Sequence, residues 1–229
     1  MSTVALPTSS ARRRVRTVAV TLAVVVAAVW IARRPLLVAI GSMLVVEDAL
    51  APVDVIVISS AGVREDSLEA AQLYHDGISR RLVVAKWFDE PLDAELRRIG
   101  VQNLDATSLA LAILEHSGVP SSAVTVVPGP VAGTEDEVVA TAEYVRAVDA
   151  HGVLFLAPRT HTARARWLLR RRLPPAVQLV VRSGRLDHFE VDGWWRHRDQ
   201  SREVMAEYFR WLNSALLGDR WHSPHATPE

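Results

Sequence analysis

Residues 153–167 read VLFLAPRTHTARARW, an apolar run followed directly by a segment that can form a helix. The run 153–157 is typical of a buried parallel strand, and Pro158 ends it. Thr160 predicts the N-cap of the helix, because its hydroxyl can accept hydrogen bonds from backbone N–H groups of the first turn. This strand–turn–helix unit is the one that the rest of the chain repeats.

The first turn of this predicted helix carries an unusual charge. His161 and Arg164 lie three residues apart, on one face of the turn. A helix N-terminus carries about half a positive charge, so a cation there costs roughly 0.3–1 kcal/mol. A cation beside free N–H donors is typical of an anion-binding site. The alternative is that Arg164 is a solvated surface side chain and His161 a hydrogen-bonded loop residue.

Composition excludes several classes of protein. The 229 residues include 26 Lys and Arg and 26 Asp and Glu, so no overall charge points to nucleic acid as a partner. The absence of cysteine excludes a disulfide framework and thiolate metal sites. Apolar residues make up 49% of the chain, which is enough for one good core.

An apolar stretch near the amino terminus predicts a membrane anchor at residues 17–34. Residues 1–16 are polar and rich in arginine, and residues 18–32 then run without a charge. This run is shorter than the ~20 residues of an ideal spanning helix, but the flanking arginines can snorkel to the interface. The anchor ends in WIARR, a poor cleavage site, which favours an uncleaved anchor over a signal peptide.

The distribution of arginine predicts the orientation of the anchor. More arginines precede it than follow it, so residues 1–16 are expected in the cytoplasm and the globular part outside. We therefore expect a single-pass protein of the plasma membrane with an extracytoplasmic domain. Residues 35–52 form an apolar connector that packs on the anchor or lies at the interface.

Residues 53–217 repeat the pattern of buried strand, polar turn and amphipathic helix. Strands are predicted at residues 53–58, 81–86, 123–127, 153–157 and 177–181, with helices at 65–76, 105–116, from 134, from 160 and at 198–217. Residues 87–104 are irregular and charged, and residues 128–130, PGP, break the third strand. Alternating strands and helices imply right-handed crossovers and a five-stranded, mainly parallel sheet covered on both faces. Ligands of such sheets bind beyond the carboxyl ends of the strands, near the point where the strand order reverses.

The last predicted helix has an apolar stripe. It places Met205, Tyr208, Trp211, Leu212 and Ala215 on one side, a pattern typical of a face that packs on the core. Residues 218–229 are polar and contain prolines, which predicts a disordered tail.

Three carboxylates, Glu135, Asp136 and Glu137, open the helix predicted from Thr134. One interpretation is structural, because Thr134 and Glu137 fit a capping box and acidic residues suit a first turn. The other is functional: the carboxylates face the His161 loop and bind a metal ion, or provide a general base with His161 as the acid. The chain has no short metal-ligand spacing, so no metal residue is assigned.

The turn after the first strand reads SSAG, from Ser59 to Gly62. Its single glycine is not the GxGxxG pattern of dinucleotide-binding proteins, and the chain has no P-loop and no GxSxG turn. Ser59 or Ser60 is a candidate nucleophile, although two serines after a strand are more often turn formers. Trp194 and Trp195, after the fifth strand, stack on a sugar or a base or pack in the core or at the membrane edge.

The order of these features resembles the YdcF/SanA/ElyC family of membrane-associated envelope proteins. Members typically have an amino-terminal membrane segment, a strand reading DxIVVLGGG and a helix ending AxxLYxxG, and the matching stretches here are 54–62, DVIVISSAG, and 70–77, AAQLYHDG. The family's TxEE or TxEN turn is similar to residues 134–137, TEDE, and its HxxRA signature is matched by residues 161–165, HTARA. The resemblance covers roughly residues 15–215 and departs at the triple glycine, which is SSA here. It implies a Rossmann-like three-layer domain and a role in envelope or peptidoglycan-precursor homeostasis.

The leading hypothesis is a membrane-anchored YdcF-like α/β domain, residues 53–217, that binds an anionic envelope precursor at the carboxyl edge of its sheet. Arg164 and the helix N-terminus hold the anion, and His161 exchanges a proton, a role that suits the usual pKa of histidine. The predicted ligand-binding residues are Ser59, Ser60, Gly62, Thr134, Glu135 and Arg164, and the predicted catalytic residues are His161, Asp136 and Glu137. No cofactor is assigned.

Two rival hypotheses stay open. The chain is a non-catalytic partner of a membrane envelope complex that uses Trp194, Trp195 and the anchor, or it binds a nucleotide or S-adenosylmethionine. The missing glycines of the first turn count against the nucleotide hypothesis. The sequence leaves open whether the chain is an enzyme.

Overall fold

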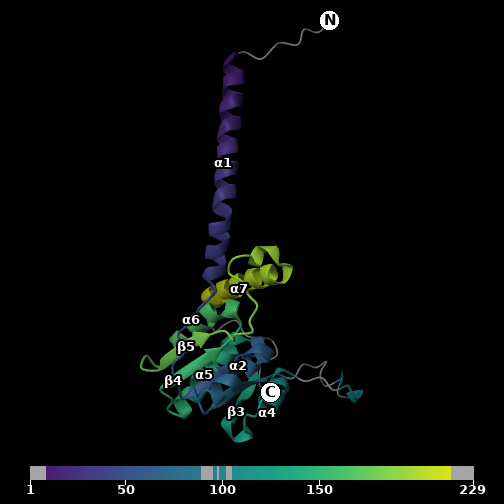
Figure 1. The fold of residues 1–229 in the computed structure, drawn as a ribbon, viewed down its shortest axis with the longest axis vertical. Helices are drawn as coiled ribbons and strands as arrows, with labels where there is room; N and C mark the ends of the chain where they lie inside the picture. The colour runs from purple at the N-terminus through teal and green to yellow at the C-terminus, as the bar shows by residue number, and fades with distance from the viewer. Residues whose placement is uncertain (1–8, 89–94, 97, 102–104, 218–229) are drawn as a thin grey trace.

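The computed structural model describes residues 9–88, 95–96, 98–101 and 105–217. Five apolar runs form one parallel sheet (Figure 1): β1 (Val55–Ile58), β2 (Leu82–Trp87), β3 (Val124–Val131), β4 (Gly152–Leu156) and β5 (Gln178–Arg182). The strand order is β3-β2-β1-β4-β5, so the order reverses between β1 and β4. The predicted five-stranded parallel α/β sheet is confirmed.

Helices cover both faces of the sheet, which explains the unbroken apolar runs of β1 and β4. Alternate residues of β1 point to opposite faces. Val55 and Val57 pack with α5 (Thr134–Ala147) and α6 (Thr162–Arg172). Ile56 and Ile58 pack with α2 (Val63–His75) and α4 (Ala106–His116). The carboxyl ends of β1 and β4 are therefore fixed next to each other in the middle of a three-layer domain.

The third strand is longer than the sequence predicted. β3 continues through Pro128 to Val131, which lies opposite Trp87 of β2. β3 is an edge strand, where the missing N–H of proline need not interrupt the pairing. A register shift between Ala85 and Trp87 accompanies the prolines. The prediction that PGP breaks this strand is therefore wrong.

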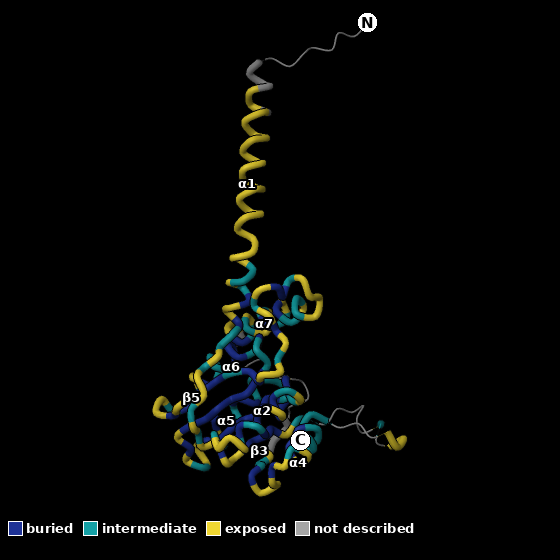
Figure 2. The backbone as a smooth tube through the Cα atoms, viewed as in Figure 1, coloured by how far each residue is buried: buried dark blue, intermediate teal, exposed yellow. Residues whose placement is uncertain are grey.

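One long helix, α1 (Ser9–Ser42), projects from the domain (Figure 1). Its segment Arg16–Ser42 is long and apolar enough to cross a membrane. Figure 2 shows most of α1 as exposed, and turns become partly buried only at its lower end. The helix does not end at the expected connector but runs through Pro35, which removes a single N–H donor from its backbone ladder.

The lower end of α1 is joined to the domain by aromatic side chains. Trp194 Nε1 donates to the Leu37 carbonyl at 2.9 Å, and Tyr208 Oη donates to the Ile40 carbonyl at 2.7 Å. A Cβ added at Gly41 would lie 2.9 Å from the Trp194 ring, so glycine permits this close approach. Trp194 thus packs at the junction of anchor and domain, as one of the two sequence interpretations expected.

The last helix, α7 (Arg198–Leu217), buries a different side from the one predicted. Met205 and Leu212 are 72% and 54% exposed, so the stripe assigned to the core is wrong at these two positions. Val204 and Glu207 are buried instead. The apolar pattern misled because the buried side of α7 contacts a polar group of the domain, described below. The predicted tail 218–229 and most of the irregular stretch 87–104 lie outside the described residues.

Candidate functional site

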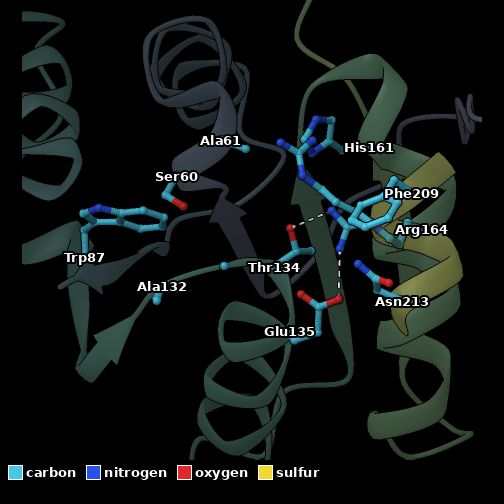
Figure 3. Close-up of a pocket in the computed structure, with 12 residues that line it drawn as sticks. Ser60, Ala61, Trp87, Ala132, Thr134, Glu135, His161, Arg164, Phe209 and Asn213 are labelled. Carbon is cyan, nitrogen blue, oxygen red and sulfur yellow. Dashed lines mark hydrogen bonds and ion pairs between the residues drawn. The ribbon is translucent and has the colours of Figure 1, made fainter. Parts of the chain in front are cut away.

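A cavity of about 410 Å³ lies at the carboxyl edge of the sheet, where the strand order reverses (Figure 3). Its walls come from the turns after β1, β3 and β4, from the end of β2, and from α7. The lining residues are Ser60, Ala61, Trp87, Ala132, Gly133, Thr134, Glu135, His161, Arg164, Phe209, Arg210 and Asn213. Five of the nine predicted site residues, Ser60, Thr134, Glu135, His161 and Arg164, therefore line one cavity.

Arg164 is the most constrained side chain of the cavity. It is 2% exposed, and its Nε lies 2.5 Å from Glu207 Oε1. Its Nη1 lies 3.2 Å from Glu135 Oε1, and its Nη2 donates to Thr134 Oγ1 at 3.1 Å. Figure 3 shows these last two contacts on the cavity side of the guanidinium. Arg164 therefore joins α5, α6 and α7 and is not a solvated surface residue.

Glu207 is a member of the site that sequence analysis missed. Its side chain is fully buried, and its second oxygen lies 3.4 Å from Arg210 Nη1. A carboxylate rarely lies fully buried without a charged partner. The signal was available, because Glu207 follows the buried Val204 by three residues on one side of α7. The anion expected beside Arg164 is thus in part a carboxylate of the protein itself.

His161 precedes α6 and lies against Glu207, with its Nε2 3.6 Å from Glu207 Oε2. Burial lowers the pKa of His161 from 6.5 to about 4, although the nearby Glu207 charge opposes the shift. The imidazole is therefore neutral at neutral pH, contrary to our expectation of a pKa suited to proton exchange. Its Nδ1 is buried without a hydrogen-bond partner in the part of the chain that the structure describes. A catalytic role for His161 stays a prediction.

The start of α6 differs from the prediction. The helix begins at Thr162, after a 3-10 turn, Arg159–His161, so Thr160 is not its N-cap. The Thr160 hydroxyl instead donates to Glu203 Oε1 at 2.6 Å, and this bond takes the group that would have capped the helix. Arg164 still lies in the first turn, as expected.

The acidic turn is not a capping box. Gly133, not Thr134, precedes the first residue of α5, and the Thr134 hydroxyl is bonded to Arg164. Glu137 reaches the turn after β1, where it accepts from the Ser60 N–H at 2.7 Å and from the Ser59 hydroxyl at 3.1 Å.

Glu137 is 2% exposed, and burial raises the pKa of its carboxyl. Asp136 accepts from the Ala132 N–H at 3.0 Å. Glu137 and Asp136 therefore shape the turns that border the cavity without lining it, and their predicted catalytic roles stay predictions.

Ser59 and Gly62 also support the cavity from behind. Ser59 caps the 3-10 turn Ser60–Gly62 by accepting from the Ala61 N–H at 3.2 Å. A Cβ at Gly62 would lie 2.4 Å from Asp66 Oδ2 and 3.0 Å from Pro158 Cδ, so glycine lets the turns after β1 and β4 approach each other.

Asp66 borders a second, more acidic hollow of about 210 Å³ that also contains Gly62, Asp187 and Glu203. Burial, followed by the nearby charge of Asp187, raises the pKa of Asp66 well above its usual range. Among the described residues, no group of three or more His, Asp or Glu side chains is arranged to hold a metal ion.

Comparison with known proteins adds no relative: no family model matches the chain, and neither the curated proteins nor the solved structures contain a match. The resemblance to the YdcF/SanA/ElyC family rests on the motifs of the sequence.

Proposed function

We propose that this chain is a membrane-anchored α/β protein that binds a small anionic ligand in the cavity beside Arg164 and acts in cell-envelope homeostasis. The observation that carries the ligand site is the position of the cavity. It lies at the carboxyl ends of β1 and β4, where the strand order reverses, and parallel α/β sheets bind their ligands at this point. A cavity of about 410 Å³ falls within the range of small-molecule sites, roughly 300–1,000 Å³.

The charges of the cavity suggest how an anion enters. Two cations, Arg164 and Arg210, line it, and Glu207 compensates part of their charge from its buried position. Glu135 is the other carboxylate on Arg164, and its side chain is 27% exposed. In this proposal the ligand displaces Glu135 from the guanidinium while Glu207 keeps Arg164 in place. Glu135 therefore competes with the ligand.

The uncharged lining residues suit a ligand with both polar and flat parts. Ser60 and Thr134 provide hydroxyl groups near the guanidinium. Figure 3 shows Trp87 and Phe209 on opposite sides of the cavity, where aromatic rings can pack on the uncharged part of a ligand.

The envelope role and the orientation rest on sequence features. The motifs of residues 54–62, 134–137 and 161–165 support the envelope role, and α1 supports anchoring to the plasma membrane with the domain outside. A periplasmic or extracellular reporter fused after Glu229 should be active. A reporter active only in the cytoplasm would contradict both the orientation and the envelope role.

The ligand proposal is tested by titrating the purified full chain with inorganic pyrophosphate in a calorimeter. We expect saturable binding that Arg210→Gln weakens, because Arg210 is the half-exposed cation of the cavity and its removal leaves the Arg164–Glu207 pair intact. Equal binding by wild type and Arg210→Gln would place the anion elsewhere.

The non-catalytic alternative has its own support. The buried Glu207 already compensates Arg164, and His161 is neutral, so these residues also fit a purely structural role. In that case the protein acts as a partner of a membrane complex through its junction with α1. Absence of pyrophosphate binding, with full rescue of a deletion strain by a stable Arg210→Gln variant, would favour this alternative.

A further inference from the structure

An exposed apolar row runs along α7. Met205, Phe209, Leu212 and Leu216 follow each other at spacings of four, three and four residues, so they share one side of the helix. Their exposed fractions are 72%, 61%, 54% and 73%. The opposite side is buried through Glu207. Single exposed apolar residues are common, but a continuous row along a helix marks an interaction surface. We call these four residues the α7 stripe.

The position of α7 relative to α1 limits what can cover the stripe. Tyr208, on α7 itself, donates a hydrogen bond of 2.7 Å to Ile40 near the lower end of α1. The buried Val204 of α7 shares an apolar cluster with Leu44. Figure 1 shows α7 beside the lower end of α1, between that end and the sheet. The stripe is therefore held at a fixed distance from the apolar part of α1.

That distance matches the surface of a bilayer. A hydrocarbon layer of about 30 Å takes about 20 helical residues. Counted from Thr17, the first residue after the arginine cluster, it ends near Leu36. Ile40 lies four residues further, which is about 6 Å at 1.5 Å per residue. The headgroup region is about 5–8 Å thick on each side, so α7 meets α1 at headgroup depth.

The charges near the stripe fit an anionic surface. Arg202 lies three residues before Met205, and Arg198 seven residues before it, so both continue the side of α7 that carries the stripe. Both arginines are exposed. Apolar side chains flanked by arginine are typical of helices that lie in the interface of an anionic membrane.

We propose that the α7 stripe inserts into the headgroup region of the bilayer that α1 spans, with anionic phospholipid as its partner. This inference rests on the membrane anchoring proposed above. It adds a second attachment point, which fixes the orientation of the domain on the membrane. Because Phe209 belongs to the stripe and also lines the cavity, the cavity opens beside the lipid surface.

Single cysteines provide the test, since the chain has none of its own. Met205→Cys and Leu212→Cys are each labelled with an environment-sensitive nitrobenzoxadiazole dye. Glu115→Cys, at an exposed position of α4 at the far end of the domain, is the matched control (Figure 1). The full chains are reconstituted in vesicles of phosphatidylcholine, with or without phosphatidylglycerol and with or without nitroxide-labelled lipid.

We expect the dyes at positions 205 and 212 to emit at shorter wavelength and to be quenched by nitroxide lipid, more strongly with phosphatidylglycerol. The dye at position 115 should show neither change. Chains that float with the vesicles while all three dyes behave alike would overturn the inference and leave the anchor intact. Chains that do not float would overturn both. A shift that follows the number of chains per vesicle, without nitroxide quenching, would assign the stripe to a second copy and contradict the lipid proposal.

Discussion

The Nε of Arg164 lies 2.5 Å from Oε1 of Glu207, and the two side chains are 2% and 0% exposed. The pair joins the first turn of α6 to the middle of α7, so the last helix is attached to the sheet through a buried charge pair. Such a pair contributes little net stability when both partners are present, because both charges lose their hydration. Loss of one partner is costly, since it leaves an uncompensated buried charge.

Arg164→Met or Glu207→Leu alone should therefore lower the free energy of unfolding by about 3–5 kcal/mol. The double variant, which replaces the pair by apolar side chains, should lose clearly less than the sum of the single changes. Denaturant unfolding of the four proteins gives this cycle. Additive losses would show that the two residues do not act as a pair.

Glu137 should stabilise the turn after β1 by satisfying its donors. Glu137→Ala leaves the buried Ser60 N–H and Ser59 hydroxyl without their acceptor, and an unsatisfied buried group costs about 1–3 kcal/mol. Glu137→Gln retains an acceptor oxygen and removes a buried charge, so it should cost less than Glu137→Ala. Glu143→Ala, at an exposed position of the same helix, is the control and should stay within about 0.5 kcal/mol of wild type. Equal losses for the Ala and Gln variants would contradict the hydrogen-bonding role.

The fold was largely predictable because both of its signals are local. Apolar runs predicted the five strands, and the alternation with helices predicted the parallel sheet. The position of the site followed from the topology, since the turns after β1 and β4 meet wherever the strand order reverses.

The partners within the site were not predictable from local patterns. Glu207 lies 43 residues after Arg164, and no spacing rule connects them. Thr134 and Glu137 match a capping box in sequence, yet tertiary contacts with Arg164 and the β1 turn take both side chains. The inward side of α7 was misassigned because the group it contacts is charged.

The lowered pKa of His161 predicts a pH dependence of stability. Its folded-state pKa is about 4, below the ordinary 6.5, so the folded protein binds the proton less readily than the unfolded chain. Its contribution is complete above pH 6.5 and is lost as the pH falls toward 4, by about 3 kcal/mol in total.

This loss should be absent in His161→Gln. Because Asp66 and Glu137 have raised pKa values and act in the opposite direction, the quantity to measure is the difference in unfolding free energy between wild type and His161→Gln from pH 7 to pH 4. Wild type should lose stability relative to the variant over this interval. A difference that does not change with pH would contradict a buried neutral imidazole.

The most direct test of the anion site is the affinity of Glu135→Gln for inorganic pyrophosphate, measured by calorimetry on the full chain. Glu135 is the partly exposed carboxylate that the ligand must displace from Arg164, so loss of its charge should tighten binding by about tenfold, ~1.4 kcal/mol. Glu143→Gln removes the same charge from an exposed position of α5 and should leave the affinity unchanged. Tighter binding by Glu135→Gln alone is the predicted result. Equal affinity of the two variants, or no binding by either, would contradict the proposal that Arg164 binds an anion in this cavity.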